Sequence, residues 1–216
     1  MGDFDARAAT WDDDPDKLTR AREVALAIRA AVPVTPGTTA LEYGCGTGLL
    51  GLALAPYLAH VTMADSSDGM LEVLRRKLAA GAAGNATALK LDLDLEPLPP
   101  GRFDLVCSLL ALHHVHDLDR VLGQLRAALN QGGTLCVADL DAEDGSFHGH
   151  SAEVHHGTHH GHSAEVHHGF DRTALSARLQ AAGFTAPSFT TVNEIERGSG
   201  DAARRYGVFL AVARAA

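Results

Sequence analysis

The chain has 216 residues, a length typical of one domain that buries a sizeable core. Its formal net charge of −9 argues against nucleic acid as the main partner, because binding phosphates needs a basic surface. No apolar run is long enough to span a membrane, and the acidic N-terminus has no signal-peptide core, so we expect a cytoplasmic protein. The cysteines Cys45, Cys107 and Cys136 fit reduced, buried thiols rather than a disulfide framework.

Residues 1–35 are predicted to form an N-terminal helical cap, in which a short acidic segment precedes an amphipathic helix over residues 15–31. From residue 40 onward, apolar strands and helices alternate. Predicted strands cover residues 40–43, 61–64, 87–91, 103–109 and 134–140, and predicted helices cover residues 49–58, 68–80 and 117–130. Apolar runs without alternation fit strands buried on both faces of a parallel sheet. The order of these elements therefore predicts a doubly wound α/β fold.

This alternation stops after Asp141, where residues 142–170 form a predicted histidine-rich loop. A helix is predicted over residues 171–182, and two final strands are predicted at about 184–194 and 206–213. We interpret residues 1–216 as a single domain whose sheet has seven strands.

The most informative motif covers residues 41–48, which read Leu-Glu-Tyr-Gly-Cys-Gly-Thr-Gly. The glycines at 44, 46 and 48 let the backbone turn tightly and let a ligand lie against bare main chain, next to the N-terminal amides of the following helix. Asp65 ends the next strand about 20 residues further on, where a carboxylate can accept both ribose hydroxyls. The spacing is G-x-G-x-G, because Leu49 stands where a dinucleotide fingerprint needs its third glycine.

With Glu42 before the glycines and Asp65 after them, the chain resembles the class I S-adenosylmethionine-dependent methyltransferases of the small-molecule type. The resemblance extends from about Phe4 to the end and is strongest over residues 40–141. It implies a seven-stranded, mostly parallel, Rossmann-like sheet with an antiparallel last strand. It also implies S-adenosyl-L-methionine as the cofactor.

The resemblance further implies roles for individual residues. Glu42 would reach the methionine ammonium group, Asp65 the ribose, and Met70 the face of the adenine ring. Asp92, with the main-chain N–H of the next residue, would read the adenine edge, although Asp94 is an alternative. Each acid could instead be structural, and Met70 could be plain core. The predicted cofactor-binding residues are Glu42, Tyr43, Gly44, Gly46, Gly48, Asp65, Ser66, Met70, Asp92, Leu93 and Leu109.

Residues 109–115 read Leu-Leu-Ala-Leu-His-His-Val, and many small-molecule methyltransferases carry a similar segment after their fourth strand. It would place backbone near the transferred methyl group and a histidine near the acceptor. A neutral imidazole of His113 or His114 could take the acceptor's proton, although His113 could also be a packing residue. The chain has no Asn/Asp-Pro-Pro-Tyr/Phe segment here, which disfavours methylation of adenine or glutamine amides.

Residues 148–157 and 160–169 are identical, which indicates a tandem duplication of a 12-residue unit. With one unit removed, the segment resembles a subgroup of uncharacterised methyltransferases that carry D-G-S-F-H and V-H-H-G-F motifs. In that interpretation it is a lid over the acceptor, and His168 is a third candidate catalytic residue. Two alternatives are a surface loop without catalytic use and a metal site built from His155, His156, His159 and His160. We assign no metal ligand.

The predicted function is S-adenosylmethionine-dependent methyl transfer to a small-molecule acceptor, mainly by holding acceptor and methyl group in line. Phe4, Trp11 and the histidine-rich loop would close over the acceptor and exclude water. One alternative is a non-methylating user of the same cofactor, such as a cyclase or hydrolase. Another is a non-catalytic protein that binds the cofactor or a metal through the histidine-rich loop. The acceptor atom (O, N, S or C) and the oligomeric state are left open.

Overall fold

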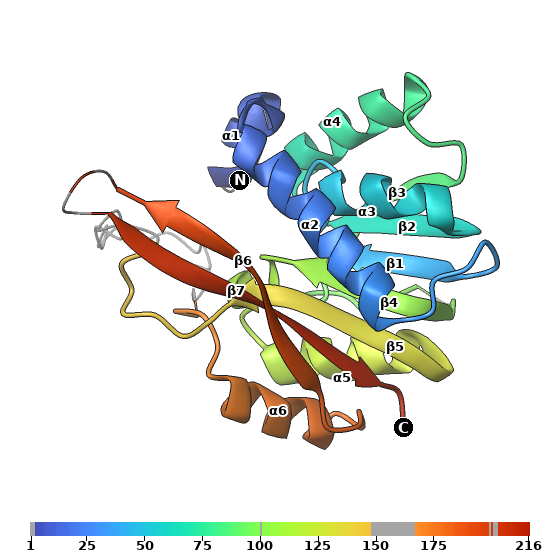
Figure 1. Ribbon diagram of the computed structural model, residues 1–216. Coiled ribbons are helices and arrows are strands. Elements are labelled where there is room, and N and C mark those ends of the chain that lie inside the picture. Colours follow the sequence, from blue (N-terminus) through green and yellow to red (C-terminus); the bar gives the residue numbers. More distant parts are fainter. Residues whose placement is uncertain (1–2, 100, 148–166, 199, 201–202) are drawn as a thin grey trace.

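Seven strands form one sheet in the order β3-β2-β1-β4-β5-β7-β6 in the computed structural model, which describes residues 3–99, 101–147, 167–198, 200 and 203–216 (Figure 1). The strands from β1 to β5 run parallel, and β7 runs antiparallel to both β5 and β6. This confirms the predicted doubly wound, mostly parallel sheet with an antiparallel last strand. The strands are β1 (Thr39–Tyr43), β2 (His60–Asp65), β3 (Ala86–Lys90), β4 (Phe103–Leu109), β5 (Leu129–Leu140), β6 (Ser188–Arg197) and β7 (Arg204–Arg214).

Helices cover both faces of this sheet (Figure 1). The helices α2, α3 and α4 pack their apolar side chains into one core cluster, and α5 and α6 pack into a second cluster on the opposite face. The strand order reverses direction between β1 and β4, which places a switch point at the carboxyl ends of these two strands. The helical elements are α1 (Asp3–Arg7), η1 (Ala8–Asp13), α2 (Pro15–Ala31), α3 (Leu49–Leu54), η2 (Ala55–Tyr57), α4 (Asp68–Ala79), η3 (Leu112–His114), α5 (Leu118–Ala128) and α6 (Arg172–Ala181).

Most differences from the predicted elements lie at their ends. The helix predicted to run to residue 130 ends at Ala128, because the chain passes directly into β5 at Leu129. The glycine pair at 132–133 therefore lies within β5, beside a register shift in its pairing with β4. Near the C-terminus, β6 begins at Ser188, and Phe184 instead forms an isolated bridge with Ala215.

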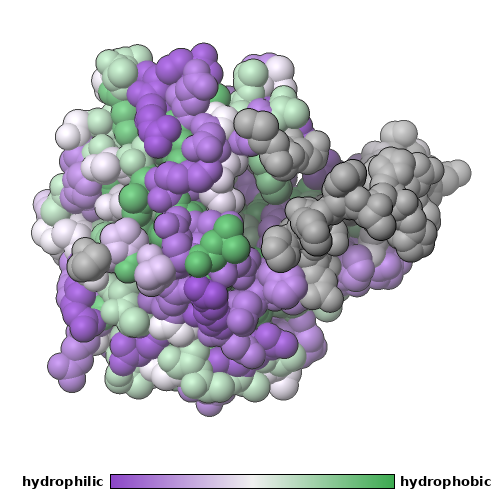
Figure 2. Space-filling view, turned by 180° about the vertical axis from the view of Figure 1, so that it is seen from behind, coloured by the Kyte–Doolittle hydropathy of each residue, from purple (hydrophilic) through white to green (hydrophobic). Residues whose placement is uncertain are grey.

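The surface of the described residues exposes few large apolar side chains, which are Leu26, Tyr57 and Leu95. Seen from behind, hydrophilic and hydrophobic side chains are interspersed over the molecule (Figure 2). Within the described ranges, none of the helices combines the length and apolar character that crossing a bilayer requires. The first repeat copy (148–157) and most of the second lie outside the described residues, as do His155, His156, His159 and His160.

Candidate cofactor and acceptor site

The glycine turn after β1 brings bare main chain to the carboxyl edge of the sheet. Gly44, Gly46 and Gly48 have φ angles of 71°, 54° and 82°, in the left-handed region that other residues disfavour. A Cβ atom at Gly44 would lie 2.2 Å from the Cβ of Ala111, and one at Gly48 would lie 2.6 Å from Cδ1 of Leu74. Gly44 and Gly48 are therefore needed for the close packing of the turn.

Gly46 differs because it is half-buried and a Cβ there would make only ordinary van der Waals contacts. The nearest atoms to a Cβ there would be Sδ of Met70 and Nε1 of Trp11, both at 3.9 Å. Met70 is buried in the first turn of α4, whereas Trp11 belongs to η1. A ligand that crosses the turn would contact the main chain of Gly46, with Met70 and Trp11 beside it.

Asp65, at the end of β2, links that strand to the glycine turn. Its Oδ2 accepts a hydrogen bond from the N–H of Gly46 at 2.6 Å, and its Oδ1 accepts one from the N–H of Ser67 at 2.8 Å. Burial raises the pKa of Asp65, and these N–H donors partly offset that effect. Ser66 is exposed, and its carbonyl accepts a hydrogen bond from Lys90. A carboxylate oxygen can accept more than one hydrogen bond, so Asp65 keeps capacity for the two ribose hydroxyls.

Glu42 lies beneath the turn and is only 2% exposed. Its Oε2 accepts a hydrogen bond from the N–H of Gly51 at 2.9 Å, so this carboxylate does cap the first turn of α3. Burial raises its pKa to about 8. A buried acid of this kind is stabilised in its charged form by a nearby cation, such as the ammonium group of the predicted cofactor. Gly51 is not among the residues predicted for this site, yet a Cβ there would lie 2.5 Å from Oε2 of Glu42.

Tyr43 and Leu93 contact each other at the carboxyl end of β1. The hydroxyl of Tyr43 accepts a hydrogen bond from the N–H of Leu93 at 3.4 Å, and both residues are buried. This long contact holds the loop after β3 against β1. The role of the Leu93 N–H in reading adenine, and that of Tyr43 in the cofactor site, stay predictions.

The two rival acids of this loop have different partners. Oδ2 of Asp94 accepts a hydrogen bond from the N–H of His116, and its Oδ1 accepts one from the N–H of Asp117, both at 2.9 Å. Asp94 therefore fixes the turn before α5. Asp92 is half-buried, and its Oδ1 accepts a hydrogen bond from the N–H of Asp94 at 3.0 Å. These contacts favour Asp92 over Asp94 as the acid that faces a ligand.

The backbone after β4 turns sharply toward the glycine turn. β4 ends at the half-buried Leu109, and the next residue, Leu110, has a φ angle of 51°. Leu110 is the one non-glycine residue with positive φ in the described part of the chain. Such a conformation costs about 1–2 kcal/mol in an L-residue. It brings Ala111 against Gly44, so the carboxyl ends of β1 and β4 meet where the resemblance places the transferred methyl group.

His113 pairs with a carboxylate that the sequence analysis did not select. Its ring is 2% exposed, and its Nδ1 lies 2.6 Å from Oδ1 of the fully buried Asp139. Oδ2 of Asp139 accepts a hydrogen bond from the N–H of Leu112 at 3.0 Å. The centre of the His114 ring lies 4.0 Å from that of His113, with the two rings tilted by 45°, and 5.1 Å from that of Phe4 in an edge-to-face arrangement. In the sequence, Asp139 lies at the end of an apolar strand, as Glu42 does. This position is the local signal that could have identified it.

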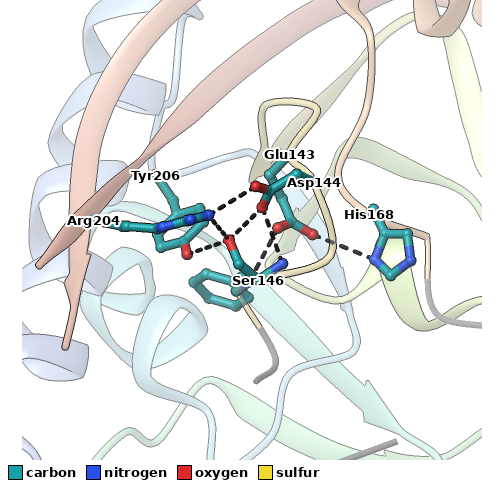
Figure 3. Close-up of polar contacts among 7 residues, drawn as sticks. Glu143, Asp144, Ser146, His168, Arg204 and Tyr206 are labelled. Carbon is teal, nitrogen blue, oxygen red and sulfur yellow. Dashed lines mark hydrogen bonds and ion pairs between the residues drawn. The ribbon is translucent and has the colours of Figure 1, made fainter. Parts of the chain in front are cut away.

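His168 lies apart from that pair, and its side chain is 60% exposed. Its Nδ1 is 3.4 Å from Oε1 of Glu143, whose side chain is 6% exposed (Figure 3). Among the described residues this Oε1 accepts no hydrogen bond, whereas Oε2 accepts one from the N–H of Phe147 at 3.0 Å. The structure therefore brings His113 and His114 together and places His168 with a different carboxylate.

The loop after β5 is fastened to β7 beside His168 (Figure 3). Arg204 donates to Oδ2 of Asp144 at 2.7 Å and to Oγ of Ser146 at 2.9 Å. The hydroxyls of Ser146 and Tyr206 are 2.7 Å apart. Hydrogen bonds from Ser146 and Arg204 lower the pKa of Asp144 to about 2. These contacts give the loop a fixed path on the acceptor side of the sheet.

The described residues contain no group of three or more histidine, cysteine, aspartate or glutamate side chains placed to hold a metal ion. The four histidines of the alternative metal site lie outside these residues, so that interpretation stays untested.

The part of the chain that contains this site also matches known proteins. Residues 40–133 match the family model described as a methyltransferase domain. The match contains the glycine turn, Asp65, Asp92 and the His113–His114 segment. The region that the match covers is the region in which the sequence resemblance is strongest.

Two curated relatives show how far the similarity extends. A ubiquinone biosynthesis O-methyltransferase of Xanthomonas campestris pv. campestris is 32% identical over 139 residues, which are 63% of this chain and 58% of that protein. An uncharacterized methyltransferase of Schizosaccharomyces pombe is 32% identical over 120 residues, 52% of this chain and 42% of that protein. The chain thus spans about half the length of these relatives.

Solved structures share the fold over most of the chain. An S-adenosylmethionine-dependent methyltransferase from Mesorhizobium loti is 25% identical with a TM-score of 0.61, over 87% of this chain and 95% of that chain. A magnesium protoporphyrin IX methyltransferase from Synechocystis, solved with bound S-adenosylhomocysteine, has a TM-score of 0.63 at 17% identity, over 93% of this chain and 84% of that chain, and shows the fold alone. These matches agree with the predicted enzyme class, and the solved structures show the predicted fold. The subgroup with the D-G-S-F-H and V-H-H-G-F motifs stays a prediction.

Proposed function

We propose that the protein transfers a methyl group from S-adenosyl-L-methionine to a small-molecule acceptor. The observation that carries the proposal is the half-buried main chain of Gly46, whose N–H donates to Asp65 and which lies beside the side chain of Met70 within the matched methyltransferase domain. A nucleoside that crosses this main chain has its ribose at Asp65 and its base beside Met70. The small-molecule class is supported by the relative named for ubiquinone biosynthesis.

Binding is divided among residues at the carboxyl ends of β1, β2 and β3. Asp65 accepts the ribose hydroxyls, Met70 packs on the adenine ring, and Asp92 accepts from the adenine amino group. Glu42 faces the amino acid part from beneath the turn, where its charged form would be stabilised by an ammonium group. Ser66, next to Asp65, adds polar groups at the rim of the same site.

The bound cofactor supplies an electrophilic methyl group on a sulfonium, and it leaves as a neutral thioether. The protein's main contribution is therefore to hold the acceptor in line with the C–S bond and to exclude water. The turn from Leu109 to Ala111 supplies the backbone wall at that point. A protic acceptor also loses a proton, and the neutral imidazole of His113 or His114 takes it. Asp139 fixes the orientation of the His113 ring.

Titration calorimetry with S-adenosylmethionine and S-adenosylhomocysteine tests the cofactor site. Transfer of a labelled methyl group to phenol, thiol, amine and quinol acceptors then tests the reaction. Saturable binding together with a methylated product supports the proposal. Failure of both ligands to bind contradicts it.

Two further outcomes identify the alternatives. Consumption of S-adenosylmethionine without methyl transfer indicates a cyclase or hydrolase. Binding without consumption indicates a non-catalytic protein. The same titrations with and without a chelator show whether a metal contributes.

A further inference from the structure

Glu143, in the loop after β5, holds a buried carboxylate whose two oxygens have different surroundings (Figure 3). The side chain is 6% exposed. Its Oε2 accepts a hydrogen bond from the N–H of Phe147 at 3.0 Å, whereas the buried Oε1 accepts none within the described part of the chain. A carboxylate oxygen that is removed from water is stable only when a donor or a cation faces it. The group that faces Oε1 is therefore expected to supply a proton or a positive charge.

The imidazole of His168, in the segment before α6, is that group. Its Nδ1 lies 3.4 Å from Oε1 of Glu143, a few tenths of an ångström beyond an ordinary N–H···O hydrogen bond. The neighbouring acid of the same loop, Asp144, is instead paired with Arg204 at 2.7 Å. A small movement of the ring with an N–H at Nδ1 gives Glu143 the donor that its Oε1 lacks.

The backbone keeps these two side chains opposite each other. The N–H of Glu143 donates to the carbonyl of His168 at 2.9 Å, and the N–H of His167 donates to the carbonyl of His113 at 2.7 Å. The ring of His168 also lies against Gly145, where a Cβ would be 3.2 Å from its Cε1. With Glu143 and Gly145 on either side, the ring has little room to turn Nδ1 away from the carboxylate.

The other ring nitrogen is available to a ligand. The side chain of His168 is 60% exposed, and because Nδ1 faces the buried carboxylate, the exposed part of the ring is the side that bears Nε2. In a neutral imidazole one nitrogen carries the proton and the other accepts, and the hydrogen bond made by the first decides which is which. An ionised carboxylate only accepts. Glu143 therefore draws the proton to Nδ1 and leaves Nε2 as an acceptor.

We propose that Glu143 is a positioning residue that holds the proton of His168 on Nδ1, and that Nε2 accepts a hydrogen bond from a hydroxyl or amine of the acceptor. The inference rests on the proposed function. Proton removal is assigned to the pair of His113 and His114, and His168 lies apart from it. The group that His168 binds is thus a second polar group, other than the atom that is methylated. The acceptor is in this way a molecule with a hydrogen-bond donor besides its methylation site.

Glu143→Gln tests the positioning role, because it should reverse the tautomer. The N–H of Phe147 needs an oxygen at the position of Oε2, so the amide NH2 takes the position of Oε1 and donates to Nδ1. The proton of His168 then lies on Nε2. Long-range 15N–1H spectra of protein with 15N-labelled histidine, at a pH at which histidine is ordinarily neutral, distinguish the two tautomers, and His168→Gln identifies the signals. The same tautomer in wild type and Glu143→Gln overturns the proposal.

Asp144→Asn is the matched control. It makes the same change from acid to amide one residue away, on a side chain that is 66% exposed and whose partners are Ser146 and Arg204. The proton of His168 should stay on Nδ1 in this variant. A reversal there would attribute the tautomer to the path of the whole loop and would overturn the role of Glu143.

Kinetics test the binding role with an acceptor that the screen finds and its analogue in which hydrogen replaces the second polar group, such as quinol and phenol. A protonated Nε2 cannot accept, so Glu143→Gln should raise KM for the complete acceptor about tenfold, the scale of one lost hydrogen bond whose partner stays unpaired, with kcat within about twofold. KM for the analogue should not change. A fall in kcat at unchanged KM would make His168 the base, and equal effects on both acceptors would exclude a second bound group. Either result overturns the proposal.

Failure of the proposed function is recognised separately. In that case no acceptor of the screen is methylated by the wild-type protein. The tautomers of His168 in wild type and Glu143→Gln still show whether the carboxylate positions the ring.

Discussion

The two halves of the site are built in different ways. On the proposed cofactor side, which comprises residues 42–48 and 65–70, carboxylates accept hydrogen bonds from main-chain N–H groups, as Asp65 does from Gly46. On the proposed acceptor side, which comprises residues 109–115, 139–147 and 167–170, side chains pair with other side chains. His113 with Asp139 and His168 with Glu143 are the two examples.

This difference explains why one half is easier to recognise from the sequence. The cofactor side serves one ligand whose shape is fixed, and a short turn of glycines with an acid after the next strand suffices to bind it. The acceptor side must fit a molecule that differs from enzyme to enzyme. Its geometry arises when loops from β4, β5 and the segment before α6 come together. The predictions below separate the two halves, beginning with the largest expected effect.

Gly46→Val should abolish cofactor binding and leave the protein folded. A Cβ there meets no atom of the protein closer than 3.9 Å, so the added side chain occupies the space of the ligand. We expect calorimetry to show S-adenosylhomocysteine binding weakened by more than about a hundredfold, roughly 3 kcal/mol. Gly81→Val is the control, because Gly81 also has positive φ but no atom within 4 Å of its Cβ position. It should bind normally, and retained binding in Gly46→Val would remove the turn from the site.

Asp139→Ala should act on the other half and mainly on stability. The substitution leaves the buried N–H groups of Leu112 and Leu140 and the ring of His113 without their acceptor. Losing these partners should lower the free energy of unfolding by about 3 kcal/mol, as measured in urea. The dissociation constant of S-adenosylhomocysteine should stay within about twofold, below 0.5 kcal/mol. A parallel loss of cofactor affinity would show that the two halves are coupled.

Asp65→Ala should weaken S-adenosylmethionine binding by ~1.5–3 kcal/mol, the usual scale for hydrogen bonds to a charged group. The variant also removes the acceptor for the N–H of Gly46, so unfolding in urea is measured in parallel. Asp68→Ala serves as the control, because the Asp68 side chain is 72% exposed on the neighbouring turn. An unchanged dissociation constant in Asp65→Ala would contradict the ribose role.

The fold and part of the candidate site could be predicted from the sequence. The order of strands and helices, the glycine turn and the position of Asp65 follow from local patterns, and the structure and the family match bear out the fold. Trp11 at Gly46 and Asp139 at His113 could not be paired from the sequence, because each contact joins segments that are far apart in the chain. Gly51 is only nine residues from Glu42, but its contact depends on how closely α3 approaches β1. An acid at the end of a buried strand is the one local signal for Asp139, and it selected Glu42 and Asp65 but not Asp139.

Glu42 should couple cofactor binding to pH. Burial raises its pKa to about 8, so at pH 7 the folded, unliganded protein holds it mainly protonated. The ammonium group of bound S-adenosylmethionine lowers that pKa, so binding of the cofactor releases a proton. The affinity for S-adenosylmethionine should therefore rise by up to about tenfold per pH unit, ~1.4 kcal/mol, between pH 6 and 7. Calorimetry in buffers of different ionisation enthalpy measures the released proton, and Glu42→Gln should abolish it.

The raised pKa of Glu42 also makes the free energy of unfolding depend on pH. Between the ordinary glutamate pKa of 4.5 and about 8, the folded state binds a proton that the unfolded state does not. The contribution of Glu42 to stability is therefore greatest at low pH and falls as the pH rises through this window. Glu42→Gln should flatten that decline in urea unfolding. If stability falls with pH in the same way in Glu42→Gln, another titratable group causes the decline.

Deleting residues 149–160 should have the smallest effect of all. The end of the second repeat copy is built into the fold, since the N–H of His167 donates to the carbonyl of His113 at 2.7 Å and the N–H of Phe170 to that of Leu140 at 2.9 Å. The deletion keeps these residues and joins Gly161 to His148, and shortening a loop changes its closure entropy little. Cofactor affinity should be unchanged.

Turnover with an acceptor from the screen should stay within roughly tenfold of the undeleted protein, about 1.4 kcal/mol. Gly169→Ala is the contrasting variant, because a Cβ there would lie 2.2 Å from the carbonyl oxygen of Asp141, and it should destabilise the fold. If the deletion abolishes turnover while the cofactor still binds, the second repeat unit belongs to the acceptor site. If it removes stoichiometric metal together with turnover, the metal interpretation of the histidine-rich loop replaces the lid.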